Sequence, residues 1–223
     1  MELTTAVAVV TGANRGFGRH LAAQLIERGA KVYAAARDPR AIDLPGAIAL
    51  QLDVTDPESV AKAAAAASDA TLLINNAGVS AGQNLLDGDL DGIRADMETN
   101  YFGTLAVTRA FAPVIAANGG GAVLNVLSIL SWLHPGPLGS YSAAKAAAWA
   151  LTNASRDLLA PSGITVTGLH VAYMDTDMAA SIPPEQKSDP AVVAALALDA
   201  LARGDQEILG DELTGRVKAG LAG

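Results

Sequence analysis

The chain has 223 residues, of which 51% are hydrophobic, and its formal net charge at pH 7 is −8. That length suits one domain whose core is large enough to be stable without crosslinks. Cysteine is absent, which excludes disulfides, thiolate metal sites and a cysteine nucleophile, and the acidic charge argues against nucleic acid as a partner.

The high apolar content raises the question of a membrane. Much of it is alanine, and no uninterrupted apolar run approaches the ~18 residues that a membrane span needs. The N-terminal stretch MELTTAVAVVTG has neither a basic segment nor a cleavage-type sequence, so no secretory signal is expected. The three histidines are widely spaced and predict no metal site. We therefore expect a cytoplasmic protein with no membrane association.

Apolar strand-like runs alternate with helix-like segments along the chain. Strands are expected at 4–12, 31–36, 47–54, 70–78, 121–128 and 164–171, with a short last strand at 206–209. Helices are expected at 15–28, 55–67, 91–117, 140–160 and 189–202. This alternation predicts an α/β fold, a single domain over 1–223 with a doubly wound parallel sheet of the Rossmann type and helices on both faces.

Local signals mark several helix ends and one irregular segment. Gly29 is expected to end the first helix, and Thr55 with Glu58 fits a capping box at the start of the second. Residues 174–188 include SIPPEQKS and show no periodicity. This segment is either a mobile lid or a plain surface loop, and the sequence leaves both open.

The first strand runs directly into TGANRGFG, residues 11–18. In a doubly wound sheet, ligands bind beyond the carboxyl ends of the strands. Glycines let the backbone approach a phosphate closely, and the N-terminus of the following helix offers free N–H groups and a positive dipole end. The spacing Gly-x-x-x-Gly-x-Gly matches neither a P-loop nor Gly-x-Gly-x-x-Gly. Alone, it admits either a phosphate-binding loop or a structural turn.

Tyr141 and Lys145 are four residues apart in an expected helix, so they share one face. An ammonium beside a phenol favours the phenolate and would lower the pKa of Tyr141, as a general acid or base near neutral pH requires. Ser128 ends the fifth strand and would lie at the same sheet edge as the glycines. Taken alone, a Tyr/Lys pair at this spacing is usually a solvated helix face.

The combination of these motifs is more specific than any one of them. Thr11-Gly12-x-x-x-Gly16-x-Gly18, the NNAG of 75–78, Asn100, Ser128 and Tyr141-x-x-x-Lys145 together resemble the short-chain dehydrogenase/reductase family. The resemblance covers nearly the whole chain, in the right order and spacing. It implies that the glycines make room for the pyrophosphate of a nicotinamide cofactor.

The resemblance also implies a role for each matching residue. Tyr141 would donate a proton to the substrate carbonyl, Lys145 would lower the tyrosine pKa and bind the nicotinamide ribose, and Ser128 would orient the carbonyl. Asn100 would hold a water that links Lys145 to solvent. The implied cofactor-binding residues are Gly12, Asn14, Arg15, Gly16, Phe17, Gly18, Arg37, Asp53, Val54, Asn76, Ala77, Gly78, Tyr141, Lys145 and Thr176.

The end of the second strand bears on the choice of nicotinamide. An NAD enzyme usually has an acidic residue there to bind the ribose hydroxyls, but this chain has Ala36 followed by Arg37. Arg37 and Arg15 could clamp a 2′-phosphate in forked hydrogen bonds, so NADP(H) is expected in preference to NAD(H). The alternative is that Asp38 takes the ribose hydroxyls and Arg37 points to solvent.

The sequence departs from the family after the sixth strand. Val171 and Ala172 stand where the family usually carries Pro-Gly, while Thr176 is retained, so a reshaped wall of the nicotinamide pocket is expected there. Phe17 replaces a more usual aliphatic residue. Candidates for the substrate pocket are Ile129, Trp132, Leu133, His134, Leu138, Tyr173, Met174 and Met178, although core packing is the commoner role for each alone.

These observations lead to an expected function. The chain is interpreted as an NADPH-dependent carbonyl reductase, reversible as an alcohol dehydrogenase, that acts on a small hydrophobic or aromatic carbonyl. The alternative is an NADP(H)-binding sensor or scaffold without catalysis; an epimerase or dehydratase is disfavoured by the short C-terminal region. The resemblance further implies a homodimer or homotetramer that pairs through the alanine-rich helix at 142–160 and the helix at 91–117.

Overall fold

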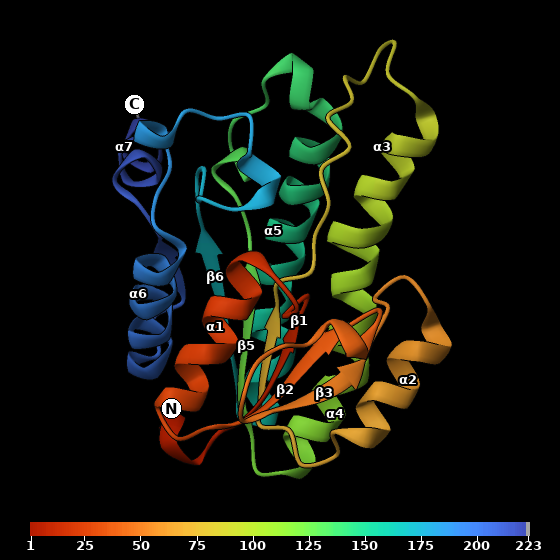
Figure 1. Cartoon of the computed structure of the whole chain (residues 1–223), viewed down its shortest axis with the longest axis vertical. Coiled ribbons are helices and arrows are strands. Elements are labelled where there is room, and N and C mark those ends of the chain that lie inside the picture. Colours follow the sequence, from red (N-terminus) through yellow and green to blue (C-terminus); the bar gives the residue numbers. More distant parts are fainter. Residues whose placement is uncertain (222–223) are drawn as a thin grey trace.

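Seven parallel strands form one sheet with helices on both faces (Figure 1). The computed structural model describes residues 1–221. The strands are β1 (Val7–Thr11), β2 (Lys31–Ala36), β3 (Ala47–Gln51), β4 (Leu72–Asn75), β5 (Gly121–Val126), β6 (Ile164–His170) and β7 (Glu207–Leu209). Their order is β3-β2-β1-β4-β5-β6-β7, so the direction of winding reverses between β1 and β4. This confirms the predicted doubly wound α/β fold of a single domain.

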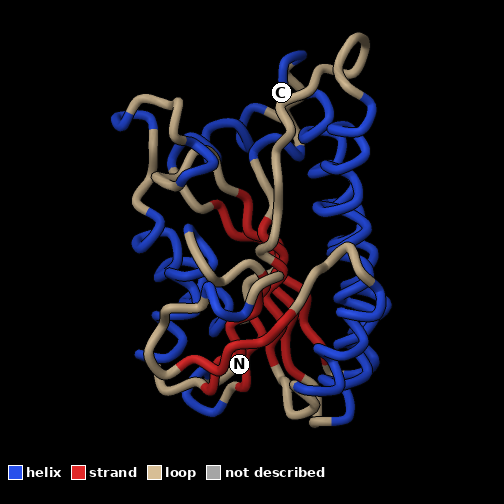
Figure 2. The backbone as a smooth tube through the Cα atoms, turned by 45° about the vertical axis from the view of Figure 1, so that its right-hand side comes forward, coloured by secondary structure: helices blue, strands red, loops and turns tan. Residues whose placement is uncertain are grey.

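The helices surround the sheet, as Figure 2 shows. They are α1 (Gly16–Glu27), α2 (Pro57–Ala66), α3 (Leu90–Met97), α4 (Thr104–Ala117), α5 (Gly139–Leu159), α6 (Pro190–Arg203) and α7 (Glu212–Gly220). A π-helical turn, η3 (Glu98–Gly103), joins α3 to α4. Among the described residues, no helix is long and apolar enough to cross a membrane.

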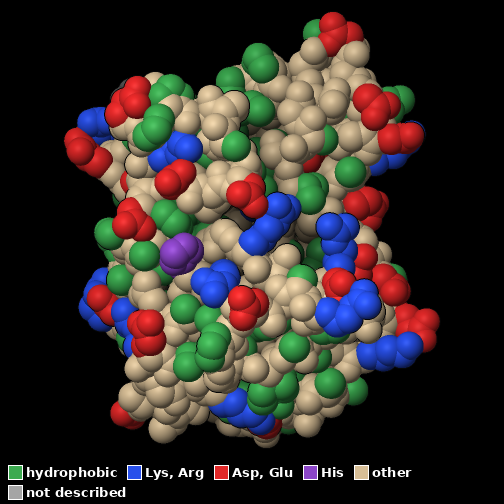
Figure 3. Space-filling view, viewed as in Figure 1, with side chains coloured by type: hydrophobic (Ala, Val, Ile, Leu, Met, Phe, Trp, Pro, Cys, Tyr) green, Lys and Arg blue, Asp and Glu red, His purple; other side chains and the backbone are tan. Residues whose placement is uncertain are grey.

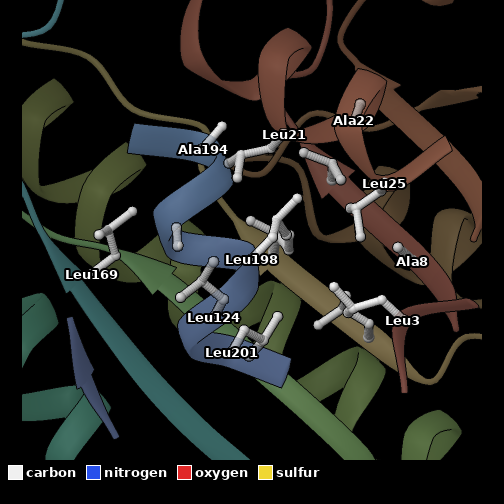
Figure 4. Packing of buried hydrophobic residues seen from close by; sticks show 14 of the residues in the cluster. Leu3, Ala8, Leu21, Ala22, Leu25, Leu124, Leu169, Ala194, Leu198 and Leu201 are labelled. Atoms are coloured by element: carbon white, nitrogen blue, oxygen red, sulfur yellow. The ribbon is translucent and has the colours of Figure 1, made fainter. Parts of the chain in front are cut away.

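Each face of the sheet has its own hydrophobic core. On one face, Leu21 and Leu25 of α1 meet Leu198 of α6 above Leu124 of β5 (Figure 4). On the other face, α2 and α4 contribute Val60 and Phe111, among others. Because both faces are covered, β1, β2 and β4 are buried almost throughout and carry little polar alternation.

Apart from shifts of a few residues at the ends of most elements, the observed elements differ from the expected ones in three places. The long helix begins at Leu90 instead of Asp91, and its π turn interrupts the α-helical hydrogen bonding. The cap of α2 is Asp56, whose side chain accepts from the backbone N–H of Glu58, so the capping box expected at Thr55 is wrong. Helix α7 was not expected, because GRVKAG contains glycines and little apolar periodicity.

The irregular segment 174–188 has a defined path. Its two ends pair through a bridge between Met174 and Ser188. Between them lie two 3-10 turns, η7 (Asp177–Ala179) and η8 (Pro184–Gln186). Segment 174–188 therefore forms a loop between β6 and α6, and the two ends of this loop lie side by side.

Candidate active site

The loop after β1 is tied to the loop after β4. The Thr11 hydroxyl accepts the backbone N–H groups of Asn76 and Ala77, each at 2.9 Å. The Asn76 amide in turn donates to the carbonyl oxygens of Thr11, at 2.8 Å, and Gly12, at 3.2 Å. These bonds hold the two loops together at the point where the sheet reverses its winding, which is where ligands bind in such sheets.

Two of the three glycines in the first loop adopt left-handed backbone conformations, with φ of 64° at Gly12 and 54° at Gly16. Gly18 is needed for space instead: a Cβ atom there would lie 2.3 Å from the Asn76 amide nitrogen and 2.4 Å from the Gly12 carbonyl oxygen. A side chain at Gly12 or Gly18 would therefore break the contact between the two loops.

Helix α1 begins within this loop without a side-chain cap. Its N-cap is Arg15, whose side chain accepts no hydrogen bond from the first turn. The backbone N–H groups of the first three helical residues, Gly16, Phe17 and Gly18, are thus available to an anion. The helix dipole also favours negative charge at this end of α1. With the tight glycine turn, these residues fit the diphosphate of a dinucleotide.

Ser128, Tyr141 and Lys145 meet beyond the end of β5. Ser128 caps a 3-10 turn, η4 (Ile129–Ser131), and its Oγ accepts from the backbone N–H of Leu130 at 3.1 Å. The Ser128 side chain lies close enough to Tyr141 to lower the pKa of its hydroxyl. The Lys145 Nζ donates to the Val126 carbonyl at 2.9 Å and lies 5.6 Å from the centre of the Tyr141 ring. The structure thus brings Ser128, which follows β5, next to the pair of Tyr141 and Lys145 on α5.

The electrostatics of this group differ from the expectation. Burial raises the pKa of Tyr141 above its usual value and the charge of Asp96 adds to this, while the Ser128 side chain acts in the opposite direction. The predicted lowering by Lys145 is not found, and the Lys145 ammonium donates to the Val126 carbonyl. Burial lowers the pKa of Lys145 to about 8, against the opposing effect of Asp96.

Asn100 lies in the π turn and faces the same site. Its side-chain nitrogen donates to the carbonyls of Val79 and Asp96, each at 2.9 Å. Its Oδ1 is buried and accepts no hydrogen bond within the described part of the chain. A Cβ atom added to Gly78 would lie 2.8 Å from this oxygen and 3.8 Å from the Lys145 Nζ. Asn100, Gly78 and Lys145 therefore border one small space, and the free oxygen fits a bound water or hydroxyl there.

The end of β2 carries the charges that bear on the cofactor. Ala36 is buried and Arg37 is exposed, and Arg37 forms no ion pair within residues 1–221. Asp38 caps a short turn and pairs with Arg40 through two hydrogen bonds, at 2.9 and 3.0 Å. The carboxylate of Asp38 is thus already occupied. Figure 3 shows Lys and Arg side chains gathered across the middle of this face.

Segment 174–188 reaches the glycine loop. The Arg15 guanidinium pairs with the Asp177 carboxylate at 3.0 Å, and both side chains are largely exposed. A Cβ atom on Gly16 would lie 3.6 Å from the Thr176 methyl carbon. The retained Thr176 therefore lies beside Gly16, at the start of α1.

The remaining expected residues lie at the same sheet edge. Asp53 accepts from the backbone N–H and hydroxyl of Thr55, at 3.0 and 2.8 Å. The Val54 side chain packs against Gly103, where a Cβ atom would lie 2.7 Å from it. Asn14 lies between the first two glycines of the loop. The end of β3 is thus packed against the π turn that carries Asn100.

Val171 and Ala172, which replace Pro-Gly, take part in backbone hydrogen bonds. The Val171 carbonyl accepts from Ile129 at 2.8 Å, and the Ala172 N–H donates to the Asp211 carboxylate at 2.7 Å. Asp211 also caps α7 through the N–H of Thr214. Helix α7, which was not expected, is therefore attached through Asp211 to the segment where Val171 and Ala172 replace Pro-Gly.

The residues expected to line the substrate pocket differ in burial: Ile129 is buried, and Leu138 and Met174 are half-buried. Leu133, Tyr173 and Met178 are exposed apolar side chains, and His134 is also exposed. Trp132 instead is buried and stacks on His170, with 3.9 Å between the ring centres.

His170 is buried beneath this site, and burial lowers its pKa to about 4. Because the Ser128 carbonyl can only accept, the Nδ1 of His170 donates to it, at 3.2 Å.

Sequence reasoning missed one buried charge at the site. Asp96 has no exposed surface and accepts from the Ala81 N–H and the Ser140 hydroxyl. Helical spacing from Asn100 places Asp96 one turn away on the same face, and this was the available signal. Among the described residues, no group of histidine, aspartate and glutamate side chains could hold a metal.

Known proteins share this sequence and fold. A sequence profile described as short chain dehydrogenase matches residues 6–187. The chain is similar to a short chain dehydrogenase from Burkholderia cenocepacia J2315 in complex with NADP, with 41% identity, a TM-score of 0.95, and coverage of 100% of this chain and 94% of that one.

Two further proteins show the range of relatives. A galactitol 2-dehydrogenase (L-tagatose-forming) from Cereibacter sphaeroides is 33% identical over 79% of this chain and 74% of its own. A 3-ketoacyl-(acyl-carrier-protein) reductase from Brucella melitensis complexed with NADH is 27% identical, with a TM-score of 0.83 and coverage of 93% of this chain and 95% of that one. Fold and sequence are thus shared among proteins whose substrates and bound nicotinamides differ.

Proposed function

This chain belongs to the short-chain dehydrogenase family of oxidoreductases, and on that premise we propose that it is an NADPH-dependent carbonyl reductase, reversible as an alcohol dehydrogenase. The observation that carries the proposal is the meeting of Ser128, Tyr141 and Lys145 beside the glycine loop. The exposed apolar side chains of Leu133, Tyr173 and Met178 near this edge support a hydrophobic or aromatic carbonyl as the substrate class.

The proposed roles follow from the state of each group. A bound nicotinamide would supply the hydride. Because its pKa is raised, the Tyr141 hydroxyl keeps its proton at neutral pH and can donate it to a carbonyl oxygen. The Ser128 hydroxyl, whose Oγ accepts from Leu130, interacts with Tyr141 and would turn its own hydrogen to the same carbonyl oxygen when a substrate is bound.

Lys145 and Asn100 support the proton donor. With a pKa of about 8, Lys145 is mostly an ammonium at neutral pH and stabilises negative charge that develops on the Tyr141 oxygen. The free Oδ1 of Asn100 offers an acceptor to a water through which Lys145 regains a proton. Position and electrostatics are thus the contribution of this chain.

NADP(H) is the proposed cofactor in preference to NAD(H). The absence of an acidic residue at Ala36, the exposed Arg37 and the occupied carboxylate of Asp38 all support a site for the 2′-phosphate. Guanidinium groups suit this ligand because they bind phosphate oxygens in pairs. The relative in complex with NADP is consistent with this choice.

The test is NADPH oxidation against a panel of aldehydes, ketones, diketones and quinones, with NADH and the variant Tyr141→Phe in parallel. We expect turnover with NADPH that falls by roughly 10²-fold or more in the variant, since it lacks the proton donor, while NADPH still binds. Turnover that survives in Tyr141→Phe would show that the donor is misassigned. Tight NADPH binding without turnover on any substrate would favour a sensor instead.

A further inference from the structure

Asp96 is a buried carboxylate to which the proposed reaction assigns no role. It lies in α3 with no exposed surface. Its Oδ1 accepts the backbone N–H of Ala81 at 2.9 Å, and its Oδ2 accepts the hydroxyl of Ser140 at 2.6 Å. The carboxylate thus joins the loop after β4 to the first turn of α5, one residue before Tyr141.

Two neutral donors do not compensate a buried carboxylate charge. A carboxylate without a cationic neighbour is costly to bury. The other charged residues of this helix and of the turn that follows, Asp91, Arg94 and Glu98, are exposed. The charge of Asp96 acts on two titratable groups of α5, Tyr141 and Lys145, although no ion pair joins Asp96 directly to Lys145 within residues 1–221. Lys145 is the cation among them, and it is itself buried.

The contacts of Asn100 connect Asp96 to the same space. The Asn100 amide donates to the backbone carbonyl of Asp96, one helical turn earlier, at 2.9 Å. On its other side, Asn100 borders the space that Gly78 leaves next to the Lys145 Nζ. Asp96 is therefore connected through Asn100 to the space beside Lys145, and through Ser140 to the first turn of α5, which carries Tyr141.

We propose that Asp96 is a positioning residue of this site: its ionised carboxylate fixes the first turn of α5 through Ser140 and serves as the counter-charge of the Lys145 ammonium. This inference rests on the proposed reductase for its catalytic consequence only. Its electrostatic part concerns the protein without cofactor and can be tested without any substrate.

The direction of the effect follows from the sign of the charge. A nearby anion favours the protonated forms of both a lysine and a tyrosine, so it raises both pKa values. For Lys145 it opposes the lowering that burial causes. Asp96→Asn keeps a hydrogen-bonding group toward Ala81 and Ser140 but removes the charge. In this variant, Lys145 loses its proton at lower pH.

The first measurement is an NMR titration of lysine side chains labelled with carbon-13, in the protein without cofactor. The chain has few lysines, and the signal of Lys145 is identified by its loss in Lys145→Met. We expect Asp96→Asn to lower the pKa of Lys145 by about one unit or more. Asp91→Asn, at an exposed position of the same helix, should leave it unchanged. An unchanged titration in folded Asp96→Asn would overturn the proposal.

Two further measurements distinguish the effect of the Asp96 charge from that of the Asp96 hydrogen bonds. Neither of them requires Asp96→Asn to fold. In the unmodified protein, the side-chain carbon of Asp96 must report an ionised carboxylate over the pH range in which Lys145 titrates. A protonated Asp96 there would overturn the proposal. Ser140→Ala removes one hydrogen bond and keeps the charge, so the pKa of Lys145 must not fall in it; a fall equal to that in Asp96→Asn would point to packing alone.

The catalytic part is read from the pH profile of kcat/KM for carbonyl reduction. In Asp96→Asn, the alkaline limb should move by about one unit to lower pH, because the acid forms of Tyr141 and Lys145 are lost earlier. If Asp96→Asn is active and the alkaline limb of its kcat/KM profile does not move, the role of Asp96 in the reaction is refuted. If the unmodified protein reduces no substrate, the proposed function fails, whereas the lysine titration still decides the electrostatic pairing.

Discussion

Lys145 brings an ammonium group into a part of the protein that water hardly reaches. Only 5% of its surface is exposed, and one hydrogen bond to the Val126 carbonyl is its observed partner. Its pKa is lowered from 10.5 to about 8, even with the attraction of Asp96 included. At neutral pH the charged form therefore costs stability, which is common for groups kept for function.

Replacing this lysine should stabilise the fold. At about 1.4 kcal/mol per pKa unit, the charged side chain costs about 3 kcal/mol at neutral pH. We expect Lys145→Met, which has a similar length and no charge, to raise the free energy of unfolding by about 1–3 kcal/mol, the lower values allowing for the lost hydrogen bond and for the Asp96 carboxylate that loses its counter-charge. Urea unfolding at neutral pH measures the difference.

The pH dependence provides the control for this prediction. Between about 8 and 10.5 the unfolded chain holds a proton on Lys145 that the folded chain has released, so the unmodified protein gains stability as pH rises through this window. The methionine variant lacks this gain. The advantage of Lys145→Met should therefore shrink toward alkaline pH, and a constant advantage would show that packing, not charge, is its cause.

Arg37 is exposed at the end of β2, where its guanidinium is available to a 2′-phosphate. We expect Arg37→Ala to weaken NADPH binding by about tenfold or more, since a charge-assisted hydrogen bond is lost, and to change NADH binding little. Fluorescence titration of both cofactors measures this, with Arg216→Ala on α7 as the control. Equal losses for NADPH and NADH would refute the phosphate contact.

At the scale of elements, the π turn between α3 and α4 decides where Asn100 points. Such turns insert an extra residue into a helix and occur frequently at functional sites. Here the turn coincides with Glu98–Gly103 and contains Asn100, whose amide binds Val79 on the loop after β4. The helix and the loop are thereby fixed to each other beside Lys145.

Segment 174–188 is held to the glycine loop by the pair between Arg15 and Asp177. In the proposed function, Arg15 would turn to a cofactor phosphate and leave this partner. Exposed pairs of this kind contribute about 0.2–1 kcal/mol. We therefore expect Asp177→Asn to tighten NADPH binding about two- to fivefold.

The matched control is Asp175→Asn, because Asp175 lies on the same segment but pairs with Lys187. Isothermal titration calorimetry of both variants with NADPH distinguishes the two ion pairs. Weaker binding in Asp177→Asn would mean that the pair holds the segment in the conformation that the cofactor requires.

At the scale of the whole molecule, the strand order brings the residues of the candidate site to one edge of the sheet. Because winding reverses between β1 and β4, the loops after both strands face the same crevice, and the ends of β5 and β6 lie beside them. This places Gly12, Asn76, Ser128 and Thr176 at one edge although the chain between the first and the last spans most of the fold.

The outer face of α5 bears on assembly. Ala143, Ala150 and Ala154 are exposed along one side of this helix, followed by Leu158, whose surface is 74% exposed. Small side chains allow a second helix to approach closely, so we expect a homodimer or homotetramer that pairs through this face. Light scattering at micromolar concentration should give a multiple of the chain mass.

A single substitution tests the face itself. Ala150→Arg should reduce the mass to a smaller species, because a long charged side chain would be buried at the contact. Ala65→Arg, at an exposed position of α2, should leave the mass unchanged. A monomer for the unmodified protein would contradict the expected assembly.

The sequence alone determined the α/β class, the positions of all seven strands to within a few residues, and the residue types of the site. These features depend on short-range properties: apolar runs, glycine spacing, and residues four apart on one helix, such as Tyr141 and Lys145. The site roles assigned to individual residues remain predictions until the experiments above are made.

Only the tertiary structure decided the features that arise between distant segments. The pKa of Tyr141 is raised by burial and by the charge of Asp96, and the lowering expected from Lys145 is not found. The cap of α2, the attachment of α7 through Asp211 and the pairing of Asp177 with Arg15 each depend on which donors fold into reach. Local patterns determine where elements form, whereas charge, burial and hydrogen-bond partners are set by neighbours that the linear order does not bring together.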